Sequence, residues 1–157
     1  MILGQECYGG YYAGIINDDG VSFHLIMSPT TGHGRHKYGE ISTNPIFSST
    51  VNGWSSSNLM LLGDYPAAKF CRGLNIGGYS DWYLPAIEEV GILYQLFQSN
   101  TLPNEQQLKD TSYISSTMVG GKVAYQYFYT GSIGVCQFDI NGTLRAIRRI
   151  PVDSSNS

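Results

Sequence analysis

The chain has little charge, because only 13% of its 157 residues are Asp, Glu, Lys or Arg, against about 25% in an average globular domain. The formal net charge is −3, so there is no broad basic field to attract nucleic acid. No apolar run approaches the ~18 residues that a membrane-spanning helix requires. We therefore expect no nucleic-acid partner and no membrane insertion.

Cysteine is also scarce. Cys7, Cys71 and Cys136 are far apart in the sequence and odd in number, which argues against a disulfide framework and against Cys-x-x-Cys chemistry. The sequence leaves a single bridge open, but Cys71 falls on the apolar face of a predicted helix, where we expect a free thiol. The first residues lack the basic start and apolar core of a signal peptide.

Catalytic motifs are missing as well. The chain has neither a P-loop nor a dinucleotide-binding fingerprint. The segment 78–82 departs from the G-x-S-x-G motif because Trp82 replaces the final glycine. His33 and His36 are three residues apart, without an acidic or sulfur ligand fixed nearby. We therefore predict a protein that is not an enzyme and that binds no metal or cofactor.

Glycine (19 residues) and tyrosine (12 residues) are abundant instead. With Ser and Asn, tyrosine supplies the rigid aromatic contacts and adaptable hydrogen bonds of evolved binding loops. The same residues also suit the strands and turns of a β-rich protein. Composition alone leaves both interpretations open.

The N-terminal third begins with a predicted hairpin. Residues Tyr11–Ile16 and Val21–Met27 are apolar and β-rich, and a turn sequence, Asn-Asp-Asp-Gly, separates them. The following stretch, Ser28–Asn58, is rich in Ser, Thr, Gly and Asn. We expect irregular surface structure there, with Trp54 as an anchor to the core.

Two helices are predicted next. Pro66 opens the first after a cap at Asp64–Tyr65, and Gly77–Gly78 ends it. Pro85 opens the second, which ends at Ser99–Asn100. The apolar stripe of the first helix consists of Ala67, Phe70, Cys71 and Leu74.

The two acids at the start of the second helix, Glu88 and Glu89, favour its macrodipole and point in different directions, so they do not form a catalytic pair. The segment that connects the helices is the most informative part of the chain. We predict structural roles there for Gly77, Gly78, Asp81, Trp82 and Pro85.

The C-terminal third predicts an antiparallel meander of strands separated by turn sequences. Its strands are Ser112–Ser116, Lys122–Tyr129, Ile133–Asp139 and Thr143–Ile150. Short antiparallel strands and two helices indicate an α+β domain with long loops. We expect one domain over residues 1–152 and a disordered tail over 153–157. First and last strands in one sheet would bring the termini together, which suits a module on a stalk.

Tyr125, Tyr127 and Tyr129 alternate along one predicted strand and therefore project from one face. They are either packed under a loop or exposed as a stacking surface, and the sequence does not decide between these alternatives. Two predicted loop tips add apolar side chains that we assign to ligand contact. They are Met118 and Val119 at one tip and Ile133 and Val135 at the other.

Four motifs resemble, in order, those of the collagen-like adhesin C-terminal domain family. They are residues 66–71 (Pro-Ala-Ala-Lys-Phe-Cys), residues 77–85 (Gly-Gly-Tyr-Ser-Asp-Trp-Tyr-Leu-Pro), residues 113–117 (Tyr-Ile-Ser-Ser-Thr) and residues 144–149 (Leu-Arg-Ala-Ile-Arg-Arg). The resemblance extends from Gly9 to Ile150. Two positions differ from the family pattern, because Ile114 and Met118 replace its usual Trp and acid.

The resemblance implies a C-type lectin-like fold, with two helices packed on antiparallel sheets and a ligand surface within residues 117–141. It also implies a homotrimer on a fibrous stalk, in a bacteriophage virion or at a bacterial cell surface. The calcium-binding tripeptides of C-type lectins and the cysteine pair of the related oxidases are absent.

We therefore expect a receptor-binding domain, foremost at the tip of a phage tail fibre, that recognises a host-surface glycan or protein. The alternatives are a bacterial adhesin, a retroelement-diversified display protein with a protein ligand, an oxidase-like enzyme, and a trimerisation module.

Overall fold

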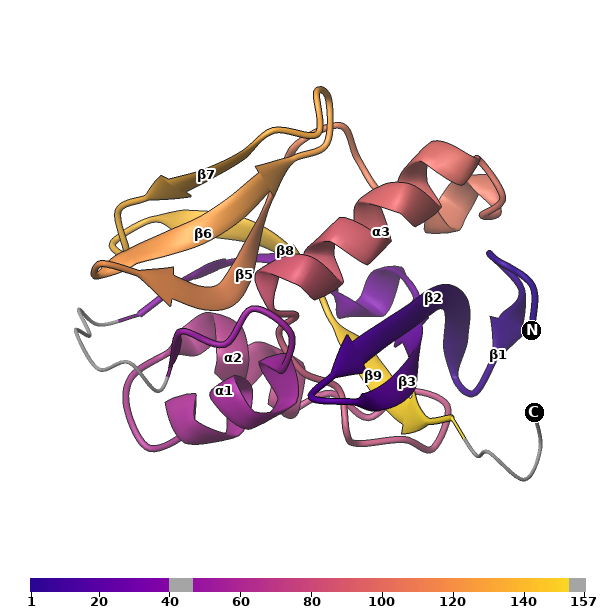
Figure 1. Ribbon diagram of the computed structural model, residues 1–157, viewed down its shortest axis with the longest axis horizontal. Helices are drawn as coiled ribbons and strands as arrows, with labels where there is room; N and C mark the ends of the chain where they lie inside the picture. The colour runs from indigo at the N-terminus through magenta and orange to yellow at the C-terminus, as the bar shows by residue number, and fades with distance from the viewer. Residues whose placement is uncertain (40–46, 153–157) are drawn as a thin grey trace.

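The computed structural model describes residues 1–39 and 47–152, so the predicted tail lies outside the described residues. The architecture is α+β, with three α-helices and two sheets in the described part of the chain. A four-stranded sheet has the order β1-β2-β3-β9, and a curled half-barrel has the order β4-β8-β5-β6-β7 (Figure 1). The elements are β1 (Glu6–Cys7), β2 (Gly10–Asp18), β3 (Val21–Met27), β4 (His33–Lys37), α1 (Gly53–Met60), α2 (Pro66–Arg72), α3 (Ile87–Ser99), β5 (Ser112–Val119), β6 (Lys122–Tyr127), β7 (Ile133–Cys136), β8 (Asn141–Arg145) and β9 (Ile147–Pro151), with 3-10 turns at Thr30–Gly32 and Asn104–Gln106.

The predicted N-terminal hairpin is confirmed by the pairing of β2 with β3. Asp19 (φ 51°) and Gly20 (φ 83°) connect the strands, and positive φ at both turn residues is typical of a tight hairpin. β9 pairs with β3, so the first and last strands share one sheet, as expected.

The predicted meander is confirmed for β5, β6 and β7, which pair antiparallel in sequence order. The prediction of one strand over Thr143–Ile150 is wrong. The chain leaves the half-barrel at Ala146, which exchanges backbone hydrogen bonds with Ser28 (3.0 Å) and Gly32 (2.9 Å). β8 and β9 therefore belong to different sheets, and β8 runs parallel to β5.

The first predicted helix is shorter than expected. α2 begins at Pro66, but Gly73 ends it, with its N–H bonded to the carbonyl of Lys69 (2.9 Å). Gly77 (φ 61°) and Gly78 (φ 84°) instead form the turn that pairs Ile76 with Tyr79. The expectation that these two glycines end the helix is therefore wrong.

The stretch expected to be irregular contains α1 and β4, so the prediction of two helices is one too few. The side chain of Asn52 caps α1 by accepting a hydrogen bond from the Ser55 N–H (3.0 Å). α1 packs through Met60 and through Ser57, whose hydroxyl accepts from the Leu84 N–H (3.0 Å). A serine-rich helix lacks the apolar stripe by which helices are predicted.

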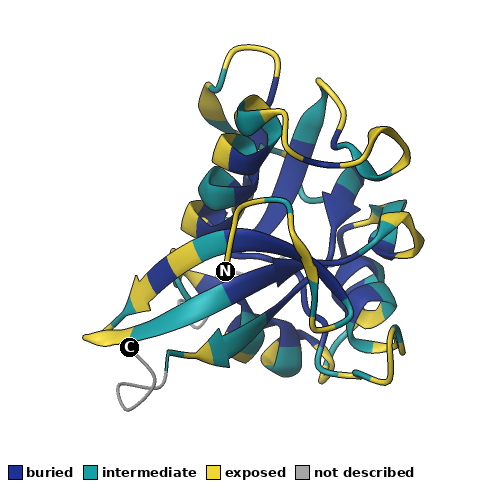
Figure 2. Cartoon of the chain, turned by 90° about the vertical axis from the view of Figure 1, so that its right-hand side faces the viewer, coloured by how far each residue is buried: buried dark blue, intermediate teal, exposed yellow. Residues whose placement is uncertain are grey.

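Among the described residues the core consists of two clusters of buried side chains. Figure 2 marks the buried residues along the chain. One cluster includes residues of α1, α2 and the half-barrel, and the other joins the four-stranded sheet to α3. Cys71 is a fully buried free thiol in the first cluster, as predicted, and Cys7 and Cys136 are free as well. Of the helices in the described ranges, none is both long enough and apolar enough to cross a membrane.

The segment between Gly77 and Pro85 contacts both sheets. Trp82 is completely buried, and its indole N–H donates to the carbonyl of Tyr79 (3.0 Å). Tyr83 pairs with Ile147 of β9, and the carbonyl of Pro85 accepts from the N–H of Ser116 in β5 (2.8 Å). The segment thereby fixes the half-barrel relative to the four-stranded sheet.

Asp81 binds Arg148 of β9 in a bidentate ion pair, with oxygen–nitrogen distances of 2.7 and 3.1 Å. The guanidinium also lies 3.8 Å from the ring centroid of Tyr79. Asp81 therefore has a structural contact, although its partner was not apparent from the sequence.

Glu89 is completely buried, and a set of donors surrounds its carboxylate. One oxygen accepts from the N–H groups of Gly53 (2.9 Å) and Ala86 (3.1 Å). The other accepts from the Tyr83 hydroxyl and from Arg149 (3.2 Å). Burial raises the pKa of Glu89, whereas Arg149 and these hydrogen bonds act in the opposite direction.

Arg149 completes this buried cluster. It donates to the Tyr83 hydroxyl (3.1 Å), to Asp18 (3.0 Å) and to the carbonyl of Val51 (2.7 Å). Strands β2 and β9 and the starts of α1 and α3 therefore meet at one ion pair. The sequence predicted that Glu89 stabilises the start of a helix, and its hydrogen bond from the Ala86 N–H does so. Its contacts with Gly53, Tyr83 and Arg149 were not predicted.

Replacing Glu89 with Ala should destabilise the protein by about 3–5 kcal/mol, because Arg149 loses its buried partner and two backbone N–H groups lose their acceptor. Urea denaturation measures the change. Glu88→Ala is the matched control, since the carboxylate of Glu88 is next in the sequence but exposed. This variant should lose no more than about 1 kcal/mol of stability. Equal costs for the two variants would contradict this role of the cluster.

Candidate functional site

A groove with a volume of about 300 Å³ lies on the half-barrel. All five strands of that sheet contribute to it. Its lining residues are Arg35, Thr111, Ser112, Ile114, Tyr125, Cys136, Ile140, Asn141, Gly142 and Thr143. Pockets for small ligands begin at about this size, so the groove can hold one sugar unit or one side chain of a partner.

Strand alternation places the groove on the face opposite α3. Tyr125 pairs with Ile114 of β5 and Gly134 of β7, and directly paired residues share a face. Gln126, the next residue of β6, is buried on the opposite face, where its side-chain oxygen faces Gly91 of α3.

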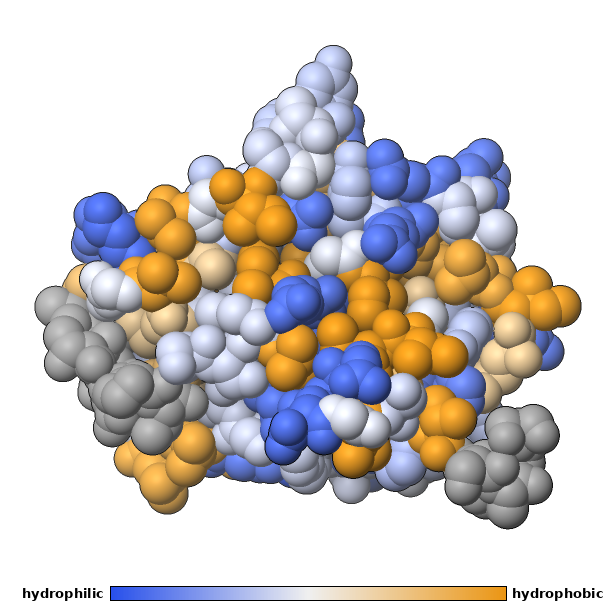
Figure 3. Space-filling model, in the orientation of Figure 1, coloured by the Kyte–Doolittle hydropathy of each residue, from blue (hydrophilic) through white to orange (hydrophobic). Residues whose placement is uncertain are grey.

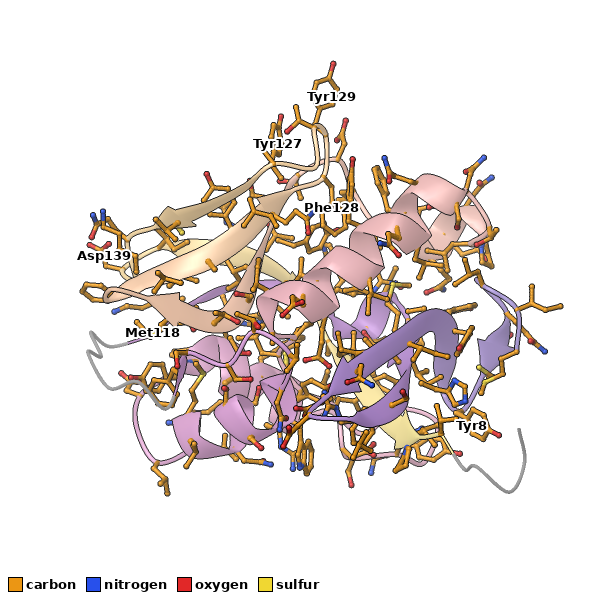
Figure 4. The ribbon with its side chains drawn as sticks, viewed as in Figure 1. Tyr8, Met118, Tyr127, Phe128, Tyr129 and Asp139 are labelled. Carbon is orange, nitrogen blue, oxygen red and sulfur yellow. The ribbon has the colours of Figure 1, made fainter. Side chains whose placement is uncertain are left out.

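Tyr127 and Tyr129 continue from the groove to the tip of the β6–β7 connection. They are 37% and 70% exposed, and their ring centroids are 6.0 Å apart. Figure 4 shows both side chains at the outer end of the hairpin, whereas Phe128 points inward toward α3. Tyr125 is half-buried. Tyr127 and Tyr129 are therefore exposed as a stacking surface and are not packed under a loop.

The predicted ligand-binding residues do not form one patch. Ile133 (64% exposed) and Val135 (47% exposed) pair with Gln126 and Ala124, so they lie on the opposite face from Tyr125. Ile133 lines a separate cavity of about 450 Å³ beside α3. Hydrophobic residues are visible around β6 and between α3 and β2 in the space-filling view (Figure 3).

The tip between β5 and β6 also differs from the prediction. Val119 is 55% exposed, as expected for a tip residue, but Met118 is only 5% exposed and packs in the core. The expectation of an exposed Met118 is therefore wrong. It pairs with Val123, which is also buried, so strand alternation turns Met118 inward and Val119 outward.

The groove is polar without being acidic. Arg35 is the one charged side chain among the lining residues that the structure describes, and its Nε donates to the carbonyl of Asn141 (3.3 Å). Hydroxyl groups of Ser112 and Thr143 add donors and acceptors. Burial raises the pKa of the Cys136 thiol, which keeps it protonated and poorly nucleophilic. This chemistry is suited to recognition of a neutral or anionic polar group.

Sequence reasoning missed the contribution of Arg35, Asn141 and Thr143. Arg35 belongs to β4, a strand hidden in the long polar stretch, and β4 pairs with β8 across more than a hundred residues. The sequence of β4, His-Gly-Arg-His-Lys, has no alternation of apolar and polar residues from which a strand is predicted. His36, considered as a metal ligand, stacks on Phe70 at 4.1 Å. Within residues 1–39 and 47–152 no three His, Cys, Asp or Glu side chains form a metal-binding group.

Gly134 provides the space in which Tyr125 lies. A Cβ atom there would approach the Tyr125 hydroxyl oxygen to 2.7 Å, so Gly134→Ala should displace the phenol ring at little cost in stability. Gly142→Ala is a contrasting variant, because its Cβ would meet the buried Ile114 side chain at 2.4 Å. It should destabilise the protein by about 1–3 kcal/mol through overpacking.

Aromatic proton spectra and urea denaturation test this pair of variants. An unmoved Tyr125 ring in Gly134→Ala, or equal stability losses in both variants, would contradict the geometry.

No protein-family model matches this chain, and no curated protein matches it either. The groove and the adjoining tyrosines are therefore the basis for a functional assignment.

Proposed function

We propose that this chain is a receptor-binding domain that recognises a host-surface glycan or protein without altering it chemically. The observation that carries the proposal is the continuity of Tyr125 and Tyr127 with a groove that is lined by no carboxylate among residues 1–39 and 47–152. Tyrosine supplies flat apolar area and a hydroxyl at low entropic cost. The groove supplies a guanidinium, an amide and hydroxyl groups for orientation.

The four motifs that resemble the collagen-like adhesin C-terminal domain family support a C-type lectin-like fold. In this proposal the most specific motif, residues 77–85, holds the two sheets together. Trp82 fills the core, and Tyr83 and Pro85 contact opposite sheets. The shared sheet of the first and last strands suits a domain mounted on a stalk. The proposed setting is the tip of a phage tail fibre or a bacterial cell surface.

Three copies on one stalk would compensate for the weakness of a single groove. One pocket of about 300 Å³ contacts only a small part of a receptor. Linked copies make the second and third binding events intramolecular, and avidity then exceeds the affinity of one site by ~10²–10⁴.

A retroelement-diversified display protein is the second candidate. The observation that favours it is the concentration of exposed large side chains, Tyr127, Tyr129, Ile133 and Val135, within one edge hairpin. Such positions tolerate substitution without disturbing the core. Adenine-directed differences between sibling strains, confined to this hairpin, would favour this candidate.

The double variant Tyr125→Ala, Tyr127→Ala should lose binding to host envelopes by about tenfold or more, because central aromatic contacts dominate interfaces. A pull-down from candidate host envelopes and a glycan array measure the loss. Tyr8→Ala is the matched control, since Tyr8 is 49% exposed and lies away from the hairpin (Figure 4).

Melting temperatures of both variants accompany the binding assay. A folded double variant that binds envelopes as well as Tyr8→Ala does would contradict the assignment of the site.

A further inference from the structure

A second cavity, of about 340 Å³, shares with the groove none of the lining residues that the structure describes. It lies where the β2–β3 hairpin, the start of α1, the 77–85 segment and β9 meet. Its lining residues are Asp18, Phe23, Asn52, Trp54, Asp81 and Arg149. Two aromatic rings, two carboxylates, an amide and a guanidinium therefore converge on one small space.

The polar side of this cavity is held rigidly. The side chain of Arg149 is only 9% exposed and is fixed by Glu89, Tyr83, Asp18 and the Val51 carbonyl. Asp18 uses one carboxylate oxygen for Arg149, so the second oxygen can accept a hydrogen bond from a ligand. The side chains of Asp18 and Asp81 are 18% and 41% exposed.

The apolar side is held as well. The half-buried ring of Trp54 meets the Tyr83 ring edge-on at 6.0 Å, and the Arg72 guanidinium lies 4.4 Å from its centroid. Arg149 covers the ring of Phe23 at 4.2 Å. Walls fixed in this way reduce the entropy that a small ligand must lose on binding.

Charge around the cavity is balanced. Asp81 is neutralised by Arg148, and the carboxylates of Asp18 and Glu89 share Arg149. The guanidinium of Arg72 lies over the ring of Trp54. Three acids and three arginines leave no net field to attract an ion. A neutral ligand with several hydroxyl groups can use both the carboxylate acceptors and the amide donor of Asn52.

We propose that this cavity binds one neutral sugar unit, a pyranose ring, with its C–H face against Trp54 and its hydroxyl groups on Asp18, Asp81 and Asn52. The volume is at the lower end of the range for ligand pockets, which favours a single ring over an oligosaccharide. So small a ligand should bind in about the millimolar range. The site is independent of the groove, so its failure leaves the proposed receptor site untouched.

A titration of the wild-type protein followed by ¹H–¹⁵N NMR tests this proposal. The probes are glucose, galactose, mannose and N-acetylglucosamine, each taken to tens of millimolar. The chain has two tryptophans, and Trp82 is completely buried, so the two indole N–H signals separate the cavity from the core. At least one sugar should shift the Trp54 indole signal saturably, together with the amide of Phe23 and the side-chain amide of Asn52.

Two variants sharpen the test. Trp54→Phe keeps an aromatic face and should retain binding within about threefold, whereas Trp54→Ala should weaken it about tenfold or more. Melting temperatures establish that both variants fold. If Trp54→Ala does not fold, the wild-type titration still decides the proposal.

Charged probes complete the design. Glucuronic acid and choline should bind more weakly than the best neutral sugar, because the site carries no net charge. The proposal is overturned if no sugar shifts the Trp54 signal, if the shifts lie in the groove of the half-barrel, or if choline binds more tightly than every sugar.

Discussion

The ion pair between Glu89 and Arg149 is the interaction on which the rest of the fold depends. Removing two charges from water costs several kcal/mol per ion, and that cost is offset only where the remaining hydrogen-bonding positions are filled. Glu89 meets this condition, since it accepts from Gly53, Ala86, Tyr83 and Arg149. Arg149 also binds Asp18, 131 residues away, so elements that are far apart in the sequence must be in place at once.

This constraint reaches both candidate sites. Pro85 follows Tyr83 by two residues and bonds to Ser116 of β5, the strand that runs beside the groove. Arg149 itself lines the second cavity. Because the centre is rigid, the β6–β7 hairpin can lie at an edge of the half-barrel with outward side chains that contribute little to the core. This hairpin carries the exposed Tyr127 and Tyr129. Exposed side chains at such an edge are free to meet a partner.

Local patterns in the sequence predicted the parts of the fold that local chemistry determines. The Asp19–Gly20 turn specifies the β2–β3 hairpin, and alternation specifies that Tyr125 and Tyr127 share one face of β6. The helix over Gly53–Met60 was missed because serine, not an apolar stripe, forms its buried face. The change of sheet at Ala146 was missed because its cause is a contact with Ser28 and Gly32, more than a hundred residues away.

The candidate site shows the same division. The tyrosines were found because their spacing is a property of one strand. That Ile133 and Val135 lie on the opposite face from Tyr125 follows from the pairing of β6 with β7, which neither strand reveals alone. Met118 was expected to be exposed together with Val119, but the alternation of β5 turns Met118 inward and Val119 outward. Arg35 and the second cavity depend on pairings across the whole chain, and no local pattern indicates them.

The most direct test of recognition through the tyrosine face is photo-crosslinking. The protein is prepared with p-benzoylphenylalanine in place of Tyr127 or, separately, of Tyr8, and each form is illuminated on bacterial envelopes that retain it. A covalent adduct from position 127 and none from position 8 is the predicted result. An adduct from position 8 alone, or none from position 127 while the protein still binds the envelopes, would contradict it.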